Sequence, residues 1–94
     1  MSSPAQKFLK HVANVIAERS SQYGDVAGSM AAIAQRWSTT LGREVTAGQV
    51  VLCLLDLKLA RLAHDPNHED SAVDVCGYAA LLRKLAETSN TKGR

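Results

Sequence analysis

The sequence predicts an all-α protein, a four-helix bundle built around a central antiparallel helical hairpin. Apolar residues recur at helical spacing in four segments, and no segment alternates with the two-residue period of a strand. The composition agrees, because 46% of residues are hydrophobic, only 4% are aromatic, and the chain holds two prolines. At 94 residues the chain makes one domain, which we assign to residues 1–88, with a polar C-terminal tail at 89–94.

The first two helices are bounded by recognisable end signals. Ser3 is the expected N-cap of the first helix, with Pro4 in its first turn, and this helix should fade near residues 20–21. Its stripe at helical spacing comprises Phe8, Val12, Val15 and Arg19, and Leu9 and Ile16 widen it. The second helix follows Gly28 and Ser29 and should end at Gly42 as its C-terminal cap. One face of this helix carries Met30, Ile33, Ala34, Trp37 and Leu41.

The third and fourth helices form the hairpin. Thr46 and Gln49 have the spacing of a capping box, and the helix they open should run to about Ala63. Residues 50–62 are apolar on nearly every side, so we expect a central helix or one shared with a partner subunit in a homo-oligomer. Residues 65–67 break it, and the fourth helix should run from near His68, with Asn67 as its N-cap, to about Thr88.

The distribution of charged and apolar residues disfavours some classes of binding partner. The net charge is +2 and the basic residues are scattered without a cluster, which disfavours polymeric DNA or RNA. The N-terminus lacks the pattern of a signal peptide and no apolar run is long enough to span a bilayer, so we expect a cytoplasmic protein with no membrane partner. Cys53 and Cys76 are expected to be free, buried thiols.

Three carboxylates stand on helical faces that are otherwise apolar. Asp56 interrupts the stripe from Leu52 to Ala63, while Asp70 and Asp74 share a face of the fourth helix. Measured from the break, Asp56 and Asp74 lie at depths of about 12 Å and about 9 Å, so the two carboxylates should be nearly level in the hairpin. Acids at one level repel unless a cation lies between them, and all-oxygen ligands suit Mg²⁺. Asp56, Asp70 and Asp74 are therefore the candidate metal ligands.

The acidic and basic residues of the hairpin also allow interpretations without a bound metal. Asp70 fits the positive end of the fourth helix and Asp74 fits a salt bridge to Arg61, with no ligand involved. Lys58 and Arg61 can pair with acids of the fourth helix or face the phosphates of a ligand. The segment 23–25 is either a ligand-contacting loop or a plain turn.

Five segments between Glu18 and Leu82 carry a resemblance to a known family: ERSSQYGD, IAQRW, LGREVT, LLDLKLARLAH and HEDSAVDVCGYAAL. They resemble a family of small phage and prophage proteins that is similar to the nucleotide-modification-associated domains of phages. More distantly, the chain resembles the all-α, MazG-like nucleoside triphosphate pyrophosphatases, which are Mg²⁺-dependent helical oligomers. Asp56 alone stands where those enzymes carry their first pair of metal-binding acids.

The resemblance implies a phage-type protein, acting in the host cytoplasm, that binds a nucleotide or a nucleotide-derived small molecule. In this interpretation Mg²⁺ is held by the three acids, Lys58 and Arg61 meet phosphate, and Tyr23 or Tyr78 stacks on the base. Hydrolysis of a nucleoside triphosphate to the monophosphate and pyrophosphate is the activity implied. One alternative is a non-catalytic protein that sequesters a nucleotide signal of antiphage defence, and a second is a structural or protein-interaction module.

Overall fold

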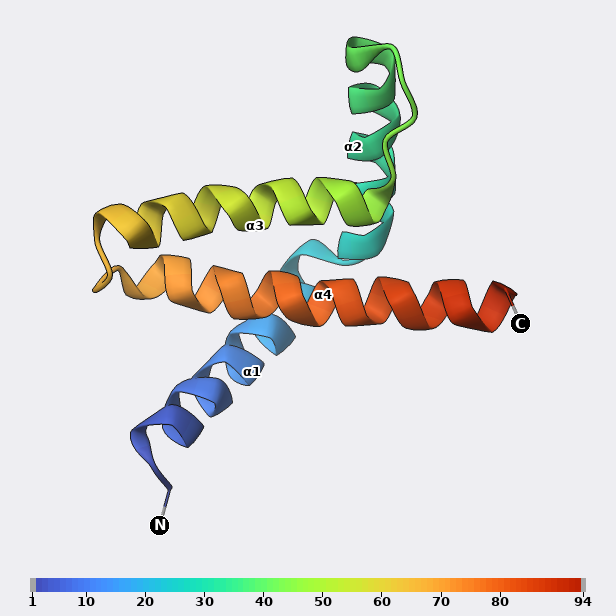
Figure 1. Cartoon of the computed structure of the whole chain (residues 1–94). Coiled ribbons are helices and arrows are strands. Elements are labelled where there is room, and N and C mark those ends of the chain that lie inside the picture. The colour runs from blue at the N-terminus through green and yellow to red at the C-terminus, as the bar shows by residue number, and fades with distance from the viewer. Residues whose placement is uncertain (1, 94) are drawn as a thin grey trace.

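Four α-helices follow one another along the chain, in a computed structural model that describes residues 2–93, with side chains from residue 2 to residue 87. They are α1 (Pro4–Tyr23), α2 (Val26–Leu41), α3 (Ala47–His64) and α4 (Glu69–Gly93), and the described residues contain no strand (Figure 1). The prediction of an all-α, four-helix fold is confirmed. The last helix continues past the predicted end at Thr88, and Arg94 lies outside the described residues.

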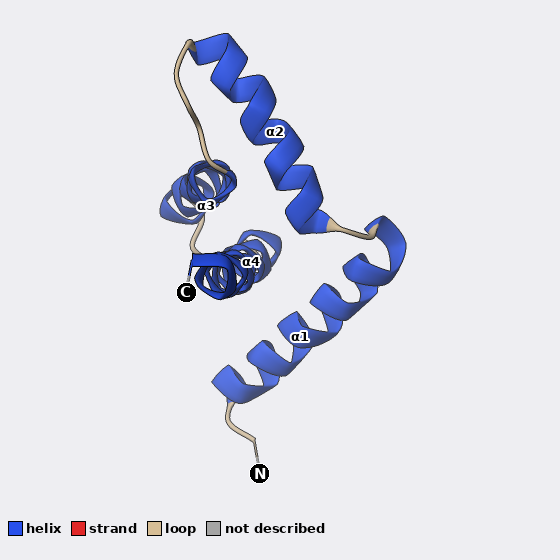
Figure 2. Ribbon diagram, turned by 90° about the vertical axis from the view of Figure 1, so that its right-hand side faces the viewer, coloured by secondary structure: helices blue, strands red, loops and turns tan. Residues whose placement is uncertain are grey.

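The hairpin of α3 and α4 organises the molecule. These two helices run antiparallel and share the most extensive packing, α2 crosses the N-terminal part of α3, and α1 contacts α4 more sparsely (Figures 1 and 2). The view along the hairpin in Figure 2 shows α1 and α2 reaching away from it in different directions. None of the described helices is both long enough and apolar enough to cross a membrane.

Local capping chemistry sets most of the helix boundaries. The predicted Ser3 cap and Thr46–Gln49 capping box are both present, and Gly42 caps α2 with a left-handed φ of 69°. Two starts differ from the prediction. Helix α2 begins earlier, because the side chain of Asp25 accepts the backbone N–H of Gly28. At the start of α4 it is the side chain of His68, not that of the predicted Asn67, that accepts a backbone N–H, the one of Ser71.

The hydrophobic core lies where α2 and α4 pack against α3. Its buried members are Met30, Ala34, Val50 and Val51, and half-buried residues of α4 pack against them. Of the two situations predicted for α3, a central helix covered within one chain holds for one side only, and a helix shared with a partner subunit stays a prediction. One side of α3 is buried, whereas the side that carries Leu52, Asp56 and Leu59 is exposed in this chain.

Two glycines of contrasting conformation allow the capping account to be tested. At Gly42 the φ is +69°, a region costly for any residue with a Cβ, so Gly42→Ala should destabilise the fold by about 1 kcal/mol. At Gly77, inside α4, a Cβ would meet no atom within 4 Å, so Gly77→Ala should stabilise it by up to about 1 kcal/mol. Thermal unfolding of both variants beside wild type measures the two effects. The same direction of shift in both would contradict the capping account.

Candidate functional site

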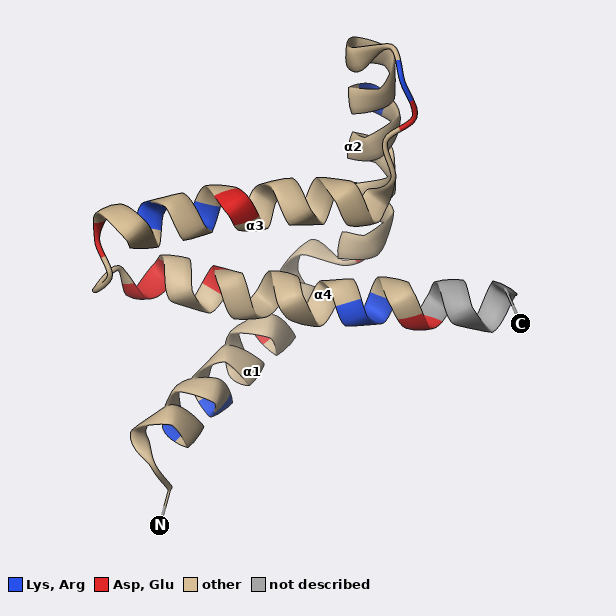
Figure 3. Ribbon diagram, viewed as in Figure 1, with Lys and Arg blue, Asp and Glu red and all other residues tan. Residues whose placement is uncertain are grey.

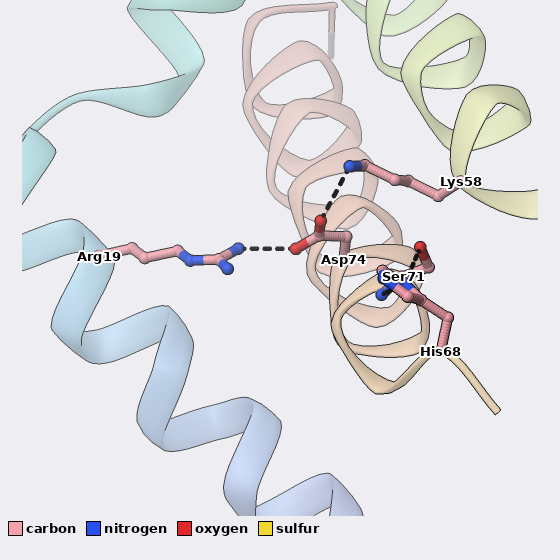
Figure 4. A network of polar contacts seen from close by, with 5 residues as sticks. All are labelled: Arg19, Lys58, His68, Ser71 and Asp74. Atoms are coloured by element: carbon pink, nitrogen blue, oxygen red, sulfur yellow. Dashed lines mark hydrogen bonds and ion pairs between the residues drawn. The ribbon is translucent and has the colours of Figure 1, made fainter. Parts of the chain in front are cut away.

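The carboxylate of Asp74 joins three helices. Arg19 of α1 donates from Nη1 to Asp74 Oδ1 at 2.9 Å, and Lys58 Nζ of α3 lies 3.2 Å from Asp74 Oδ2 (Figure 4). The side chain of Asp74 is 17% exposed and that of Lys58 is 21% exposed, so this pair is partly shielded from water. Arg19, with 52% of its side chain exposed, approaches from the outside.

These contacts also set the charge state of Asp74. Burial of the carboxyl raises its pKa, but the hydrogen bonds from Arg19 and Lys58 and the positive charges of both side chains together outweigh burial. The net effect places the pKa of Asp74 below its ordinary value of 3.8. Asp74 is therefore a carboxylate at neutral pH, with a cation on each of its oxygens.

A cavity of about 250 Å³ opens beside this ion pair, between the C-terminal part of α1, the start of α2 and the middle of α4. Its wall is largely apolar and includes Ile16, Val26 and Leu81. Its polar contributors are Arg19, Asp74, Lys84 and the half-buried Tyr78, together with Ser20. An apolar cavity with a few polar groups and an aromatic ring has the usual composition of a small-molecule site.

The three acids predicted as metal ligands are not brought together. Asp56 is exposed on the side of α3 that faces away from α4, and Asp70 is exposed in the first turn of α4. Among the described residues no group of three or more His, Cys, Asp or Glu side chains is placed to hold a metal ion. The residue of α3 whose side chain reaches Asp74 is Lys58, not Asp56. The described residues thus do not offer the predicted oxygen set for Mg²⁺, and magnesium binding stays a prediction.

The residues predicted to bind the ligand separate into two groups. Tyr78 lines the cavity, whereas Tyr23 is 74% exposed at the end of α1 and is not part of the cavity wall. Lys58 pairs with an acid of α4, as one of the open interpretations expected. Arg61 is exposed in the last turn of α3, where a cation stabilises the negative end of a helix.

A serine and a histidine lie within hydrogen-bond distance at the start of α4. His68 Nδ1 is 2.7 Å from Ser71 Oγ and also accepts the backbone N–H of Ser71 (Figure 4). This pair is a helix cap rather than a nucleophile with its base, because Ser71 is 1% exposed and a substrate cannot reach it. Both cysteines are free, as predicted, but Cys53 is exposed rather than buried.

Two cavity residues were missed by reasoning from the sequence. Arg19 falls in the stripe of α1 that is otherwise apolar, and a cation on that stripe was a signal for an acidic partner. Lys84 stands one residue before Leu85, which belongs to the apolar face of α4, and nothing in its spacing marks it as part of a site.

The helical hairpin and the cavity beside it define an all-α protein with a candidate ligand site. The chain matches the model of a domain of unknown function, DUF6378, over residues 7–86, and it belongs to that family. It is also similar to the Gene 55 protein of Mycobacterium phage L5, at 35% identity over 69 residues. That match covers 72% of this chain and 44% of the phage protein, so the chain spans less than half of that relative. The two matches support the resemblance to a phage protein family, and no solved structure matches the chain.

The ion pairs of Asp74 predict a stability effect. Asp74→Asn leaves Arg19 and Lys58 without their anion and should lower the free energy of unfolding by about 1–3 kcal/mol, between the values for exposed and buried pairs. Asp70→Asn is the matched control, since Asp70 is exposed and forms no ion pair within the described residues. Chemical denaturation measures both variants. Equal losses in the two would show that the Asp74 pairs contribute nothing specific.

The lowered pKa of Asp74 predicts a pH dependence. Because the folded pKa lies below the unfolded one, the contribution of Asp74 is fully present above about pH 4 and is lost as the pH falls through the folded value. The stability difference between wild type and Asp74→Asn should therefore be constant near neutral pH and shrink on acidification below about pH 4. Urea unfolding between pH 7 and pH 3 follows it. A difference that grows on acidification contradicts the assignment.

Proposed function

We propose that this protein binds a nucleotide or a nucleotide-derived small molecule in the cavity between α1 and α4, and that it does so without hydrolysing it. The observation that carries the proposal is the placing of Arg19 and Lys84 with Tyr78 in the wall of one largely apolar cavity. Guanidinium and ammonium groups bind phosphate, and an aromatic ring stacks on a base. The resemblance of the sequence to nucleotide-handling families fits the same ligand class.

Arg19 retains donors for a phosphate while it holds Asp74. The guanidinium carries five N–H donors, and the bond to Asp74 engages its Nη1. Because half of this side chain is exposed, its other nitrogens can be reached from the cavity mouth. The ion pair with Asp74 then fixes the orientation of the guanidinium before the ligand arrives, which lowers the entropy lost on binding.

Gly77 supports the proposal from the other side of the cavity. Glycine inside a helix is destabilising relative to alanine, and here a Cβ would project into space free of atoms within 4 Å. Gly77 lines the cavity, so the missing side chain leaves room for a ligand against the α4 backbone. The volume of about 250 Å³ is small for a binding site, which favours one nucleotide over a dinucleotide as the buried portion.

The proposal favours binding over hydrolysis because of the state of Asp74. Metal-assisted hydrolysis of a triphosphate uses carboxylates that are free to hold the metal, whereas both oxygens of Asp74 are engaged by cations. Holding a nucleotide without turning it over is the behaviour required of a protein that sequesters a nucleotide signal. The alternative, implied by the MazG-like resemblance, is Mg²⁺-dependent hydrolysis of a nucleoside triphosphate. The experiments below also test this alternative.

The test is calorimetric titration with nucleoside mono-, di- and triphosphates and cyclic dinucleotides, each with and without Mg²⁺. We expect at least one nucleotide to bind, and Gly77→Leu to weaken that binding about tenfold or more by filling the cavity, because a well-packed site tolerates added volume poorly. Lys84→Gln should weaken it about tenfold through loss of a charged hydrogen bond. Lys10→Gln, an exposed change on α1 outside the cavity wall, is the matched control and should bind as wild type does.

Three outcomes would count against the proposal. If no nucleotide of the panel binds at millimolar concentration, the proposed ligand class is wrong. If Gly77→Leu has the helical content of wild type and binds as tightly, the cavity is not the binding site. Pyrophosphate release from a triphosphate in the presence of Mg²⁺, at a rate above that of the protein-free control, replaces sequestration with hydrolysis.

A further inference from the structure

The exposed side of α3 is an apolar surface with one charge in it. Its residues recur at helical spacing and all are exposed: Leu52, Cys53, Asp56, Leu59, Ala60 and Ala63, here called the outer face of α3. Leu52 and Leu59 are 48% and 46% exposed. A contiguous apolar stripe of this kind on a small protein indicates an interaction surface rather than scattered surface residues.

A second apolar surface lies on α2, close to the first. Ile33, Arg36, Trp37, Thr40 and Leu41 line a hollow, here called the α2 hollow, in which Leu41 is 63% exposed. The C-terminal half of α2 extends beyond α3, on the side away from α4, in both views (Figures 1 and 2). Because α2 and α3 pack against each other, the outer face of α3 and the α2 hollow lie on neighbouring helices.

The two surfaces carry opposite charges. Asp56 is the charged residue of the outer face of α3, and Arg36 is the charged residue of the α2 hollow. Neither has an ion-pair partner among the described residues. Figure 3 shows α3 with an acidic band near its middle and tan ribbon on its N-terminal side. Pairing the outer face of α3 with a second copy of itself would bring two Asp56 carboxylates together, whereas pairing it with the α2 hollow brings Asp56 to Arg36.

The exposed area of the chain points to a partner of substantial size. The accessible surface is 7018 Å² for a chain of 10.1 kDa, against about 5,300 Å² expected of a compact monomer of that mass. The excess of about 1,700 Å² exceeds the roughly 800 Å² that each partner buries in a standard interface. The radius of gyration is likewise 14.9 Å, compared with about 12 Å for a compact domain of this length.

We propose that two copies of this chain form a two-fold dimer in which the outer face of α3 of each copy packs against the α2 hollow of the other. Asp56 then pairs with Arg36 twice, once on each side of the two-fold axis. A two-fold axis makes such contacts reciprocal, and the proximity of the two surfaces on one chain lets a single closed interface use both. Neither surface includes a residue of the cavity wall, so this dimer leaves the proposed ligand site open.

Two leucines of α3 provide a matched pair for the first test. Leu59 lies in the outer face of α3 and Leu57, 56% exposed, lies outside it. Sedimentation equilibrium from micromolar to hundreds of micromolar concentration should show wild type and Leu57→Glu as dimers, and Leu59→Glu as a monomer with unchanged helical content. A monomeric wild type across this range overturns the proposal, as does a Leu59→Glu variant that dimerises as wild type does.

Charge reversal tests the pairing itself. Asp56→Arg and Arg36→Asp should each weaken dimerisation at least tenfold, because each places like charges across the interface. The double variant restores opposite charges with the positions exchanged, and it should recover most of the wild-type association. Failure of the double variant to exceed either single variant overturns the pairing of Asp56 with Arg36. Nucleotide titration of the same variants should remain at wild-type level, which separates this proposal from that of the ligand cavity.

Discussion

The ion pairs of Asp74 join α1 and α3 to α4. The hairpin of α3 and α4 has its own apolar packing, but α1 rests on α4 by few contacts. Arg19 of α1 and Lys58 of α3 both reach the one carboxylate of α4, so a single side chain fixes the position of a helix on each side. Removing this carboxylate leaves Arg19 and Lys58 without their shared anion. Helix α1 then loses its ion pair with α4.

The same constraint determines what the cavity can do. The C-terminal part of α1 and the middle of α4 both line the cavity, and Arg19 of α1 and Asp74 of α4 meet in its wall. The cations that neutralise Asp74 also leave the neighbourhood suited to an anion rather than to a metal ion with carboxylate ligands. If the proposed ligand binds here, structure and binding are coupled through Asp74, because the guanidinium that it orients serves both.

Much of the fold was predictable because its signals are local. Ser3, Thr46 and Gly42 cap helices through contacts within a few residues, and such contacts are legible in the sequence. The placing of Asp56 was not. Residues 50–62 are apolar almost all round, so helical periodicity alone could not select which side of α3 faces α4. The partnership of Arg19 with Asp74 spans 55 positions and depends on how α1 packs, which no local pattern encodes.

The most direct test of this account is residue-resolved mapping of the ligand by nuclear magnetic resonance. A ¹⁵N-labelled sample is titrated with the nucleotide that binds best in calorimetry, and backbone amide shifts are followed residue by residue. We predict that the largest changes fall on Gly24, Gly77 and Tyr78, around the cavity between α1 and α4. Changes centred on Asp56 and Asp70, with the cavity residues unmoved, would contradict the assignment of the ligand to this cavity.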